Sequence, residues 1–216
     1  MKLYPVMMNL EGRLTIVIGG GSVAARKIAD LFEAGAVVKV ISPEFASEVI
    51  DLKRMNPDRI ELVNRCYVKG DLQGAVLVFS ATDIREVNSS VFAEAEESGI
   101  LVNAVDDPPN CSFYVPSFVR RGDLIFALST SGASPAMAAK LRRMLEDMLP
   151  CEVDQILKVL RRGREILKTD ESFRHIDTVC RGEILKKIVN DDALLDKLAS
   201  CSCDNEIISF LKENSN

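Results

Sequence analysis

The chain has 216 residues, a formal net charge of −5 at pH 7 and a pI of about 5.1, an acidic balance that argues against bulk nucleic-acid binding. Hydrophobic residues make up 47% of the chain and charged residues 27%, which is typical of a globular protein and excludes wholesale disorder. No apolar run approaches about 18 residues, so we expect neither a membrane-spanning helix nor a membrane partner.

Short apolar runs alternate with helical patterns in the first half of the chain. Residues 13–18 are apolar and rich in β-branched side chains, which predicts a buried strand, and the glycines at 19–21 predict a tight turn into a helix over 23–34. The further expected elements are strands at 37–42, 59–65, 75–82 and 100–105 and helices at 44–55 and 85–99. Pro43 is suited to start the helix at 44. Mostly apolar strands separated by helices predict a parallel sheet covered on both faces, in a doubly wound fold.

The pattern changes near residue 107, at the turn-rich sequence DDPPNC. Two strand-like runs follow at 113–119 and 124–130, with a hairpin turn expected at 120–123. A helix then opens at Ser134-Pro135 and runs to Pro150. Later helical stretches are expected at 153–167, 181–189, 193–199 and 206–213.

We therefore expect an α/β protein in three parts: an N-terminal Rossmann domain over 1–112, a central α/β region over 113–149 and a helical C-terminal domain over 150–216. The two strands of the central region are too few to form a stable sheet alone. Pairing across a two-fold axis would supply the missing strands, so we predict a homodimer built on this region.

The glycine turn is the first candidate site. Gly19 to Ala24 fit the pattern G-x-G-x-x-A between a strand and a helix. Gly19 would allow the tight turn and Gly21 a close approach of a pyrophosphate to the backbone. The diphosphate would then lie on the amides that start the helix, at Ser22 and Val23. The pattern predicts dinucleotide binding; the alternative is a purely structural turn.

The ends of two strands complete this cofactor site. The position for a ribose-binding carboxylate holds Ser42-Pro43-Glu44, and no Lys or Arg follows before Lys53. The absence of a cation for a 2′-phosphate favours NAD over NADP. Thr82 and Asp83 close the fourth strand at the sheet edge where ligands bind, although a helix-capping role is an equal alternative.

Adjacent carboxylates follow the fifth strand, in Asp106-Asp107-Pro108-Pro109. A carboxylate at this end of a strand, beside the cofactor crevice, is placed for proton transfer, and Asp106 follows the strand directly. The alternative is an ordinary Asp-Pro turn.

A hydroxyl-rich loop, residues 129–135, runs into the helix that Ser134 caps. Such a loop at a helix N-terminus can bind an anion, and Arg142 lies two turns along the same helix. We take Ser129, Thr130, Ser131, Ser134 and Arg142 as candidate substrate-binding residues; simple capping explains only Ser134.

The cysteines give no metal signature. Of six cysteines only Cys201 and Cys203 are close-spaced, and the single histidine, His175, has no partner at ligand spacing. We therefore expect no bound metal. The N-terminus lacks the apolar core of a signal peptide, so we expect reduced thiols and a cytoplasmic location.

Together these segments resemble the precorrin-2 dehydrogenase and sirohydrochlorin ferrochelatase family, the N-terminal part of siroheme synthases. The matching stretches, in the family's order over residues 4–150, are YPVMMNLEGR, VIGGGSVAARK, SATDIREVN, NAVDDPPNCSFYVPS and LSTSGASPAMAAKLR.

The resemblance implies oxidation of precorrin-2 to sirohydrochlorin with hydride transfer to NAD⁺, and in some members Fe²⁺ insertion to give siroheme. It assigns the catalytic aspartate to Asp106, cofactor contacts to Ser22-Val23 and Pro43-Glu44, and the family's serine-rich loop to residues 129–134. Precorrin-2 carries eight carboxylates, a ligand that the paired arginines of the second half of the chain suit. Two alternatives remain open: a nucleotide-sensing regulatory module, and an NAD-dependent oxidoreductase for another substrate.

Overall fold

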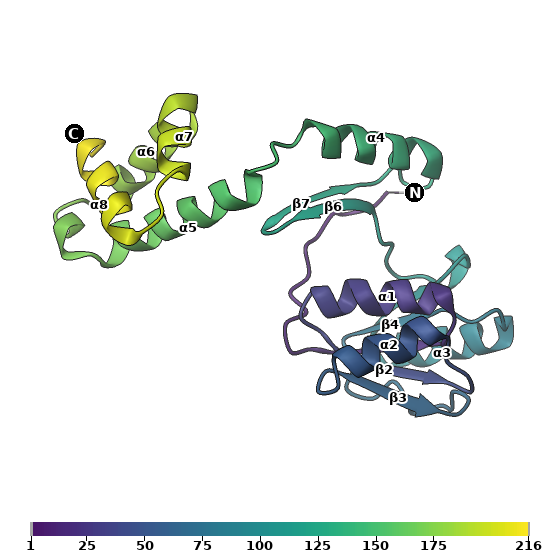
Figure 1. Cartoon of the computed structure of the whole chain (residues 1–216). Coiled ribbons are helices and arrows are strands. Elements are labelled where there is room, and N and C mark those ends of the chain that lie inside the picture. The colour runs from purple at the N-terminus through teal and green to yellow at the C-terminus, as the bar shows by residue number, and fades with distance from the viewer. Residues whose placement is uncertain (1, 216) are drawn as a thin grey trace. The chain divides into compact units, whose positions relative to one another are not determined.

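The computed structural model describes residues 2–215, and contacts between residues divide the chain into two compact units (Figure 1). One unit comprises residues 4–115 and the other residues 116–215 with residues 2 and 3. Phe113 packs edge-on against Phe79 with ring centroids 5.4 Å apart, which ties the end of the first unit to its sheet. The predicted division of the second unit near residue 150 stays a prediction.

The unit of residues 4–115 is built on a five-stranded parallel sheet of order β3-β2-β1-β4-β5. Its elements are β1 (Leu14–Ile18), α1 (Ser22–Glu33), β2 (Val37–Ser42), α2 (Ser47–Met55), β3 (Ile60–Asn64), β4 (Leu77–Ser80), α3 (Arg85–Ser98) and β5 (Leu101–Ala104). The order reverses between β1 and β4, so the chain leaves these neighbouring strands toward opposite sides. The predicted doubly wound Rossmann fold is confirmed.

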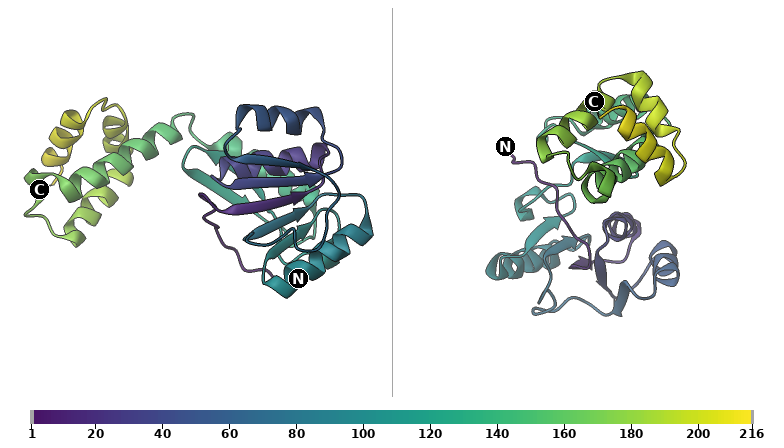
Figure 2. Two further views of the ribbon diagram at one scale, coloured as in Figure 1. Left: turned by 90° about the horizontal axis from the view of Figure 1, so that it is seen from below. Right: turned by 90° about the vertical axis from the view of Figure 1, so that its left-hand side faces the viewer.

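Helices cover both faces of this sheet, as Figure 2 shows. On one face α1 and α2 pack on side chains that include Val17, Val38 and Phe79. On the other face α3 and the segment before β4 pack on Ile16, Ile41 and neighbouring residues. Successive strand residues point to opposite faces, so burial on both sides requires the continuous apolar runs that the sequence contains.

The connection from β3 to β4 is fixed by two carboxylates. Glu94 of α3 is buried and accepts hydrogen bonds from the amides of Gly70 (2.9 Å) and Leu72 (3.0 Å) and from the Tyr67 hydroxyl. Burial and this carboxylate raise the pKa of Tyr67. Asp71 forms a two-pronged pair with Arg65, at 2.6 and 2.7 Å, which lowers the pKa of Asp71. These hydrogen bonds therefore fix the conformation of residues 65–72, which follow β3.

The second unit joins a β-hairpin to helices. It contains β6 (Ser117–Arg121), β7 (Leu124–Leu128), α4 (Pro135–Met148), α5 (Val153–Thr169), α6 (Thr178–Val189), α7 (Asp192–Ala199) and α8 (Asp204–Glu213). Short 3₁₀ turns lie at Pro108–Asn110 in the first unit and at Glu171–Phe173 in this one. Helix α4 packs on the hairpin, whereas α5 to α8 enclose a core of their own around Phe173 and Leu211.

Several local predictions are wrong. The strand expected at 113–119 spans Ser117–Arg121, and the strand expected at 75–82 spans Leu77–Ser80. Pro43 does not start the second helix: α2 begins at Ser47, because the amide of Ala46 is held by the carbonyl of Gly20 at 2.8 Å and the intervening residues follow the glycine turn. The hairpin turn contains only Gly122 and Asp123. Arg120 and Arg121 continue β6, where they pair with Ile125 and Leu124. Gly122 has φ +56°, a conformation that a tight hairpin turn requires and glycine adopts without strain.

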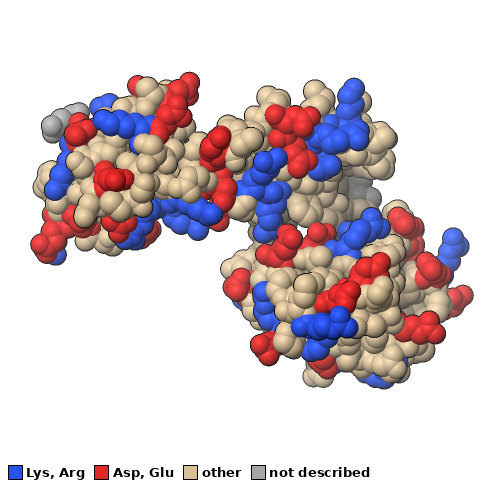
Figure 3. Space-filling view, viewed as in Figure 1, with Lys and Arg blue, Asp and Glu red and all other residues tan. Residues whose placement is uncertain are grey.

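The described residues contain no helix that is long and apolar enough to cross a membrane. Acidic and basic side chains are interspersed over the face of the molecule in Figure 3.

Candidate functional site

A cavity of about 550 Å³ opens where the strand order reverses, at the carboxyl ends of β1, β2 and β4. Three segments that lie far apart in the sequence meet there: the glycine turn, the end of β2 and the end of β4. Its lining residues include Gly19, Gly20, Gly21, Ser42, Pro43, Glu44, Phe45, Cys66, Tyr67, Thr82, Asp83, Ile84 and Val87. The structure thus brings together seven of the nine predicted cofactor-binding residues; Ser22 and Val23 follow directly as the first residues of α1.

The first two glycines of the turn are required by close packing. Gly19 has φ +110°, and a Cβ there would overlap the carbonyl of Ala81. A Cβ on Gly20 would overlap the carbonyl oxygen of Glu44 and lie 2.9 Å from the Ser42 hydroxyl. The turn therefore lies directly against the ends of both neighbouring strands.

Gly21 differs from these glycines because its missing side chain leaves open space. A Cβ on Gly21 would meet no heavy atom within 4 Å, and the residue lines the cavity. Gly21 is also the N-cap of α1, whose first turn carries no acidic residue and receives no side-chain cap. The first amides of a helix have no partner within the helix and attract anions. This cradle fits the diphosphate of a dinucleotide.

The end of β2 supplies polar atoms on one side of the cradle. Ser42 is buried, whereas Pro43 and Glu44 are exposed beside the cavity. The amide of Arg65 donates to the carbonyl of Ser42 at 3.1 Å, so a cation does lie next to the end of β2. Its guanidinium is held by Asp71, however, and is not free to bind a phosphate.

The end of β4 forms the opposite side. Asn88, 4% exposed, accepts a hydrogen bond from Ser80 Oγ at 2.7 Å and donates to the carbonyl of Thr82 at 3.1 Å. The Thr82 hydroxyl accepts from the amide of Ile84 at 2.9 Å, just before α3 begins. Thr82 therefore orders the start of α3 while it lines the cavity. The N-cap of α3 is Ile84 and no side chain caps the helix, so the helix-capping alternative is wrong, while the cofactor-binding role of Thr82 and Asp83 stays a prediction.

Asp106 follows β5, the strand beside β4, and is not among the residues that line the cavity. Its side chain is exposed and makes no hydrogen bond or ion pair with any described residue. The carboxylate of Asp107, in contrast, accepts from Asn110 Nδ2 at 2.8 Å. Asp106 has φ +58°; among the described residues only it and Ser131 adopt a positive φ without being glycine. Strained backbone of this kind often occurs at functional sites.

The hydroxyl-rich loop belongs to the other unit. Ser134 caps α4 by accepting from the amide of Met137 at 3.2 Å, and Thr130 Oγ1 accepts from the amide of Ser134 at 3.2 Å. Ser129 Oγ accepts from the amide of Ser131 at 3.1 Å, and Ser131 is exposed. These bonds give the loop a defined shape.

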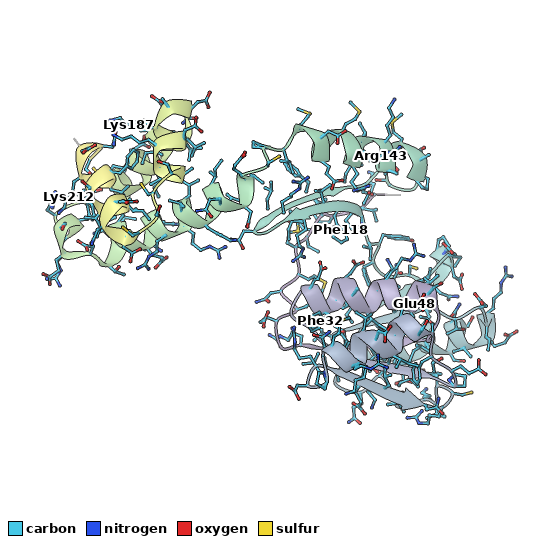
Figure 4. The ribbon with its side chains drawn as sticks, viewed as in Figure 1. Phe32, Glu48, Phe118, Arg143, Lys187 and Lys212 are labelled. Atoms are coloured by element: carbon cyan, nitrogen blue, oxygen red, sulfur yellow. The ribbon has the colours of Figure 1, made fainter. Side chains whose placement is uncertain are left out.

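The arginines of α4 differ in how freely they present their charge. The guanidinium of Arg142 pairs with Glu146 one turn along α4, at 2.7 Å. Arg143 is exposed and is labelled on α4 in Figure 4. Of the two, Arg143 has the freer guanidinium, although we singled out Arg142 from the sequence.

Sequence reasoning missed several residues that line the cavity or hold its walls by hydrogen bonds. Phe45, Tyr67 and Val87 line it but belong to no motif. Asn88 had a detectable signal: it and Glu94 are polar residues that share the buried side of α3 with Val91 and Ala95. A buried polar side chain on an apolar stripe indicates a specific hydrogen-bonding role.

Two family models match the chain. A family described as "Putative NAD(P)-binding" matches residues 6–117, and one described as "Sirohaem biosynthesis protein central" matches residues 121–148.

Among curated proteins, the chain is 39% identical over 168 residues to a siroheme synthase of Photorhabdus laumondii, covering 78% of this chain and 35% of that protein. It is 40% identical over 193 residues to the siroheme synthase of Ectopseudomonas mendocina, covering 87% and 41%. The matched part of the chain thus spans between 35% and 41% of the length of these relatives.

A solved structure of SirC, a precorrin-2 dehydrogenase, superimposes with a TM-score of 0.75 at 24% identity and covers 98% of both chains. This likeness shows that the two chains share a fold.

Proposed function

The chain belongs to the NAD(P)-binding family that it matches over residues 6–117, and from this premise we propose that it is an NAD-dependent dehydrogenase that oxidises precorrin-2 to sirohydrochlorin. One observation carries the proposal: an anion cradle at the switch point of the sheet, with an exposed and unpaired carboxylate on the next strand end. The similarity to siroheme synthases and to SirC supports the choice of substrate.

The cofactor would lie along the cavity. Its diphosphate would accept hydrogen bonds from the amides that start α1, at Ser22 and Val23, and Ser42 and Glu44 would bind the adenosine ribose. Thr82 and Asp83 would border the nicotinamide half. When bound, the nicotinamide ring accepts the hydride.

Preference for NAD⁺ over NADP⁺ is part of the proposal. The Glu44 carboxylate would repel a 2′-phosphate, and Asp71 holds the neighbouring Arg65 guanidinium. Weaker binding of NADP⁺ than of NAD⁺ in calorimetry is the expected result, and equal affinities would contradict this assignment.

Asp106 would accept the proton that the substrate loses. Oxidation removes a hydride and a proton, and the nicotinamide takes only the hydride, so a base must lie nearby. Asp106 is unpaired, whereas Asp107 is engaged by Asn110. Free lone pairs are what a general base needs, and this favours Asp106.

Carboxylates of the tetrapyrrole would be bound by the loop of Ser129, Thr130, Ser131 and Ser134, and by Arg142 once its guanidinium exchanges Glu146 for the substrate. We also propose that the chain inserts iron into sirohydrochlorin. Fe²⁺ would be a substrate, and Asp106 would also accept the pyrrole protons. Siroheme formation from sirohydrochlorin and Fe²⁺ by the parent chain, lost in Asp106→Asn, tests that step.

We further propose a homodimer formed through the hairpin and α4. The two strands β6 and β7 pair only with each other, and Ile125, Met137, Met144 and Met148 are exposed on these elements. Phe118, labelled on β6 in Figure 4, is half-buried. A second copy would extend the sheet and cover these apolar side chains. Sedimentation at micromolar concentration should give a dimer; a species of 23.8 kDa would contradict it.

The decisive experiment supplies NAD⁺ and precorrin-2 and follows the absorption spectrum of sirohydrochlorin. We expect turnover, and a fall of about 10²-fold or more in kcat for Asp106→Asn with NAD⁺ affinity little changed. Asp107→Asn is the matched control and should retain turnover. NAD⁺ binding without turnover would favour a nucleotide-sensing module, and NAD⁺ reduction with another substrate only would favour a different oxidoreductase.

A further inference from the structure

The loop that carries Asp106 is closed by hydrogen bonds on both of its sides. The amide of Val105 donates to the carbonyl of Ser80 at 2.8 Å, and the amide of Asp107 donates to the carbonyl of Ala104 at 3.2 Å. The second bond spans Asp106 and leaves it in the left-handed region, at φ +58°. A non-glycine residue persists there only when its surroundings hold it.

Cys111 contacts this turn on both sides of Asp106. Its Sγ lies 3.1 Å from the carbonyl oxygen of Ala104 and 3.4 Å from that of Asp107, and it accepts from Asn103 Nδ2 at 3.7 Å. The backbone of Cys111 also forms a bridge with Asn103 of β5. The sulfur therefore contacts the first and last residues of the turn, with the carbonyls of Ala104 and Asp107 as its acceptors.

The thiol can act as a donor here because it stays protonated. A thiol has one proton, which the two carbonyls share. Burial is the main cause that raises the pKa of Cys111, so the S–H group is retained at neutral pH. The carbonyl of Ala104 then accepts from both this thiol and the amide of Asp107.

The neighbouring residue pins the same segment at a different place. Ser112 Oγ accepts from the amide of Val102 at 2.9 Å and donates to the carbonyl of Val102 at 3.3 Å. Ser112 thus attaches the segment to β5 two residues before Ala104, and its side chain contacts neither flank of Asp106. Ser112 therefore anchors the segment to β5, whereas Cys111 holds the turn that carries Asp106.

We propose that Cys111 is a positioning residue for Asp106, holding the turn of residues 104–107 so that the Asp106 carboxylate is presented toward the substrate. The catalytic part of this inference rests on the proposed function. The thiol does not line the cavity and acts through the carbonyls of Ala104 and Asp107.

Three variants test it: Cys111→Ala, which removes the donor; Cys111→Ser, which keeps a shorter one; and Ser112→Ala, which loosens the segment elsewhere. We expect Cys111→Ala to lower kcat about 10-fold with the KM for NAD⁺ unchanged, since small displacements of a reacting group have large effects on rate. Cys111→Ser should recover most of this loss. Ser112→Ala should lower thermal stability but leave kcat near that of the parent.

A double-mutant cycle identifies the route of the effect. If Cys111 acts through Asp106, adding Cys111→Ala to Asp106→Asn should lower kcat no further. Additive losses would overturn the proposal, and so would equal kcat losses in Cys111→Ala and Ser112→Ala.

Hydrogen exchange at the Asp107 amide separates this proposal from the proposed function, because it needs no turnover. Exchange should be faster in Cys111→Ala, which frees both ends of the turn, and unchanged in Ser112→Ala, because only Cys111 contacts the carbonyls of Ala104 and Asp107. Unchanged exchange in Cys111→Ala overturns the positioning role whatever the substrate is. The parent chain could fail to oxidise precorrin-2 while Cys111→Ala still exchanges the Asp107 amide faster. That result would show that Cys111 holds the turn and that the proposed function is wrong.

Discussion

Replacing Gly21 with alanine should separate cofactor binding from folding. Gly21 has φ −80° and ψ −174°, a conformation that alanine adopts without strain, and the added methyl group would meet no heavy atom of the protein within 4 Å. The methyl group would enter open space at a residue that lines the cavity, where the diphosphate would approach the amides of α1. The variant should therefore fold normally and bind NAD⁺ poorly.

Two opposing effects keep the expected change in stability small. Alanine is a poorer N-cap than glycine by roughly 0.5–1 kcal/mol. The loss of chain freedom in the unfolded state compensates by about 0.4–1 kcal/mol. For a chain of this length, a residual of about 0.5 kcal/mol shifts Tm by only about 1–2 °C.

The expected change in binding is larger. Each hydrogen bond to a charged group contributes about 1.5–3 kcal/mol, so losing one at the diphosphate raises Kd at least about tenfold. At an NAD⁺ concentration 100 times the parent Kd, the parent gains about 2.7 kcal/mol of stability and a tenfold weaker variant about 1.4 kcal/mol.

Calorimetry of NAD⁺ binding, with thermal unfolding in the presence and absence of NAD⁺, measures both quantities. Gly20→Ala is the matched contrast, because its methyl group would overlap the carbonyl of Glu44 and should cost about 1–3 kcal/mol of stability. A Gly21→Ala variant that binds NAD⁺ with the parent Kd would refute the placement of the diphosphate on α1.

Three further outcomes are expected. Gly163→Ala should raise the free energy of unfolding by about 1 kcal/mol in urea titrations, because Gly163 lies inside α5 and its Cβ would rest 3.8 Å from Ile207 Cγ2; destabilisation would show that the helices pack closer than this. Asp71→Asn should destabilise the chain at pH 7, because Arg65 lowers the folded-state pKa of Asp71 and the pair therefore stabilises the fold above the unfolded pKa of about 3.9. That deficit should shrink as pH falls through the lowered pKa, and a deficit independent of pH would mean that the ion pair is not its cause. NAD⁺ should protect Cys66, which lines the cavity, from alkylation as read by mass spectrometry, and should leave Cys180 unprotected; equal labelling of Cys66 with and without NAD⁺ would contradict the site.

The sequence alone was sufficient for the fold of the first unit and the place of its turn. Burial on both faces demands apolar runs such as those at 13–18 and 75–82, and the spacing of Gly19 and Gly21 between strand and helix depends on neighbouring residues only. Such signals are local, so they can be read from the chain directly. The bounds were less accurate: the run at 75–82 contains a strand only at Leu77–Ser80, because pairing with β1 and β5 limits its length.

The tertiary structure decided which polar groups are free. Side-chain geometry that no sequence pattern encodes determines three pairings. Asp71 holds Arg65, Glu146 pairs with Arg142, and Asn110 donates to Asp107. The left-handed backbone of Asp106 and its support by Cys111 likewise arise from hydrogen bonds made after the chain turns back on β5. Hydrophobic periodicity reports where a residue is buried, whereas the availability of a charge depends on the partner that the fold brings to it.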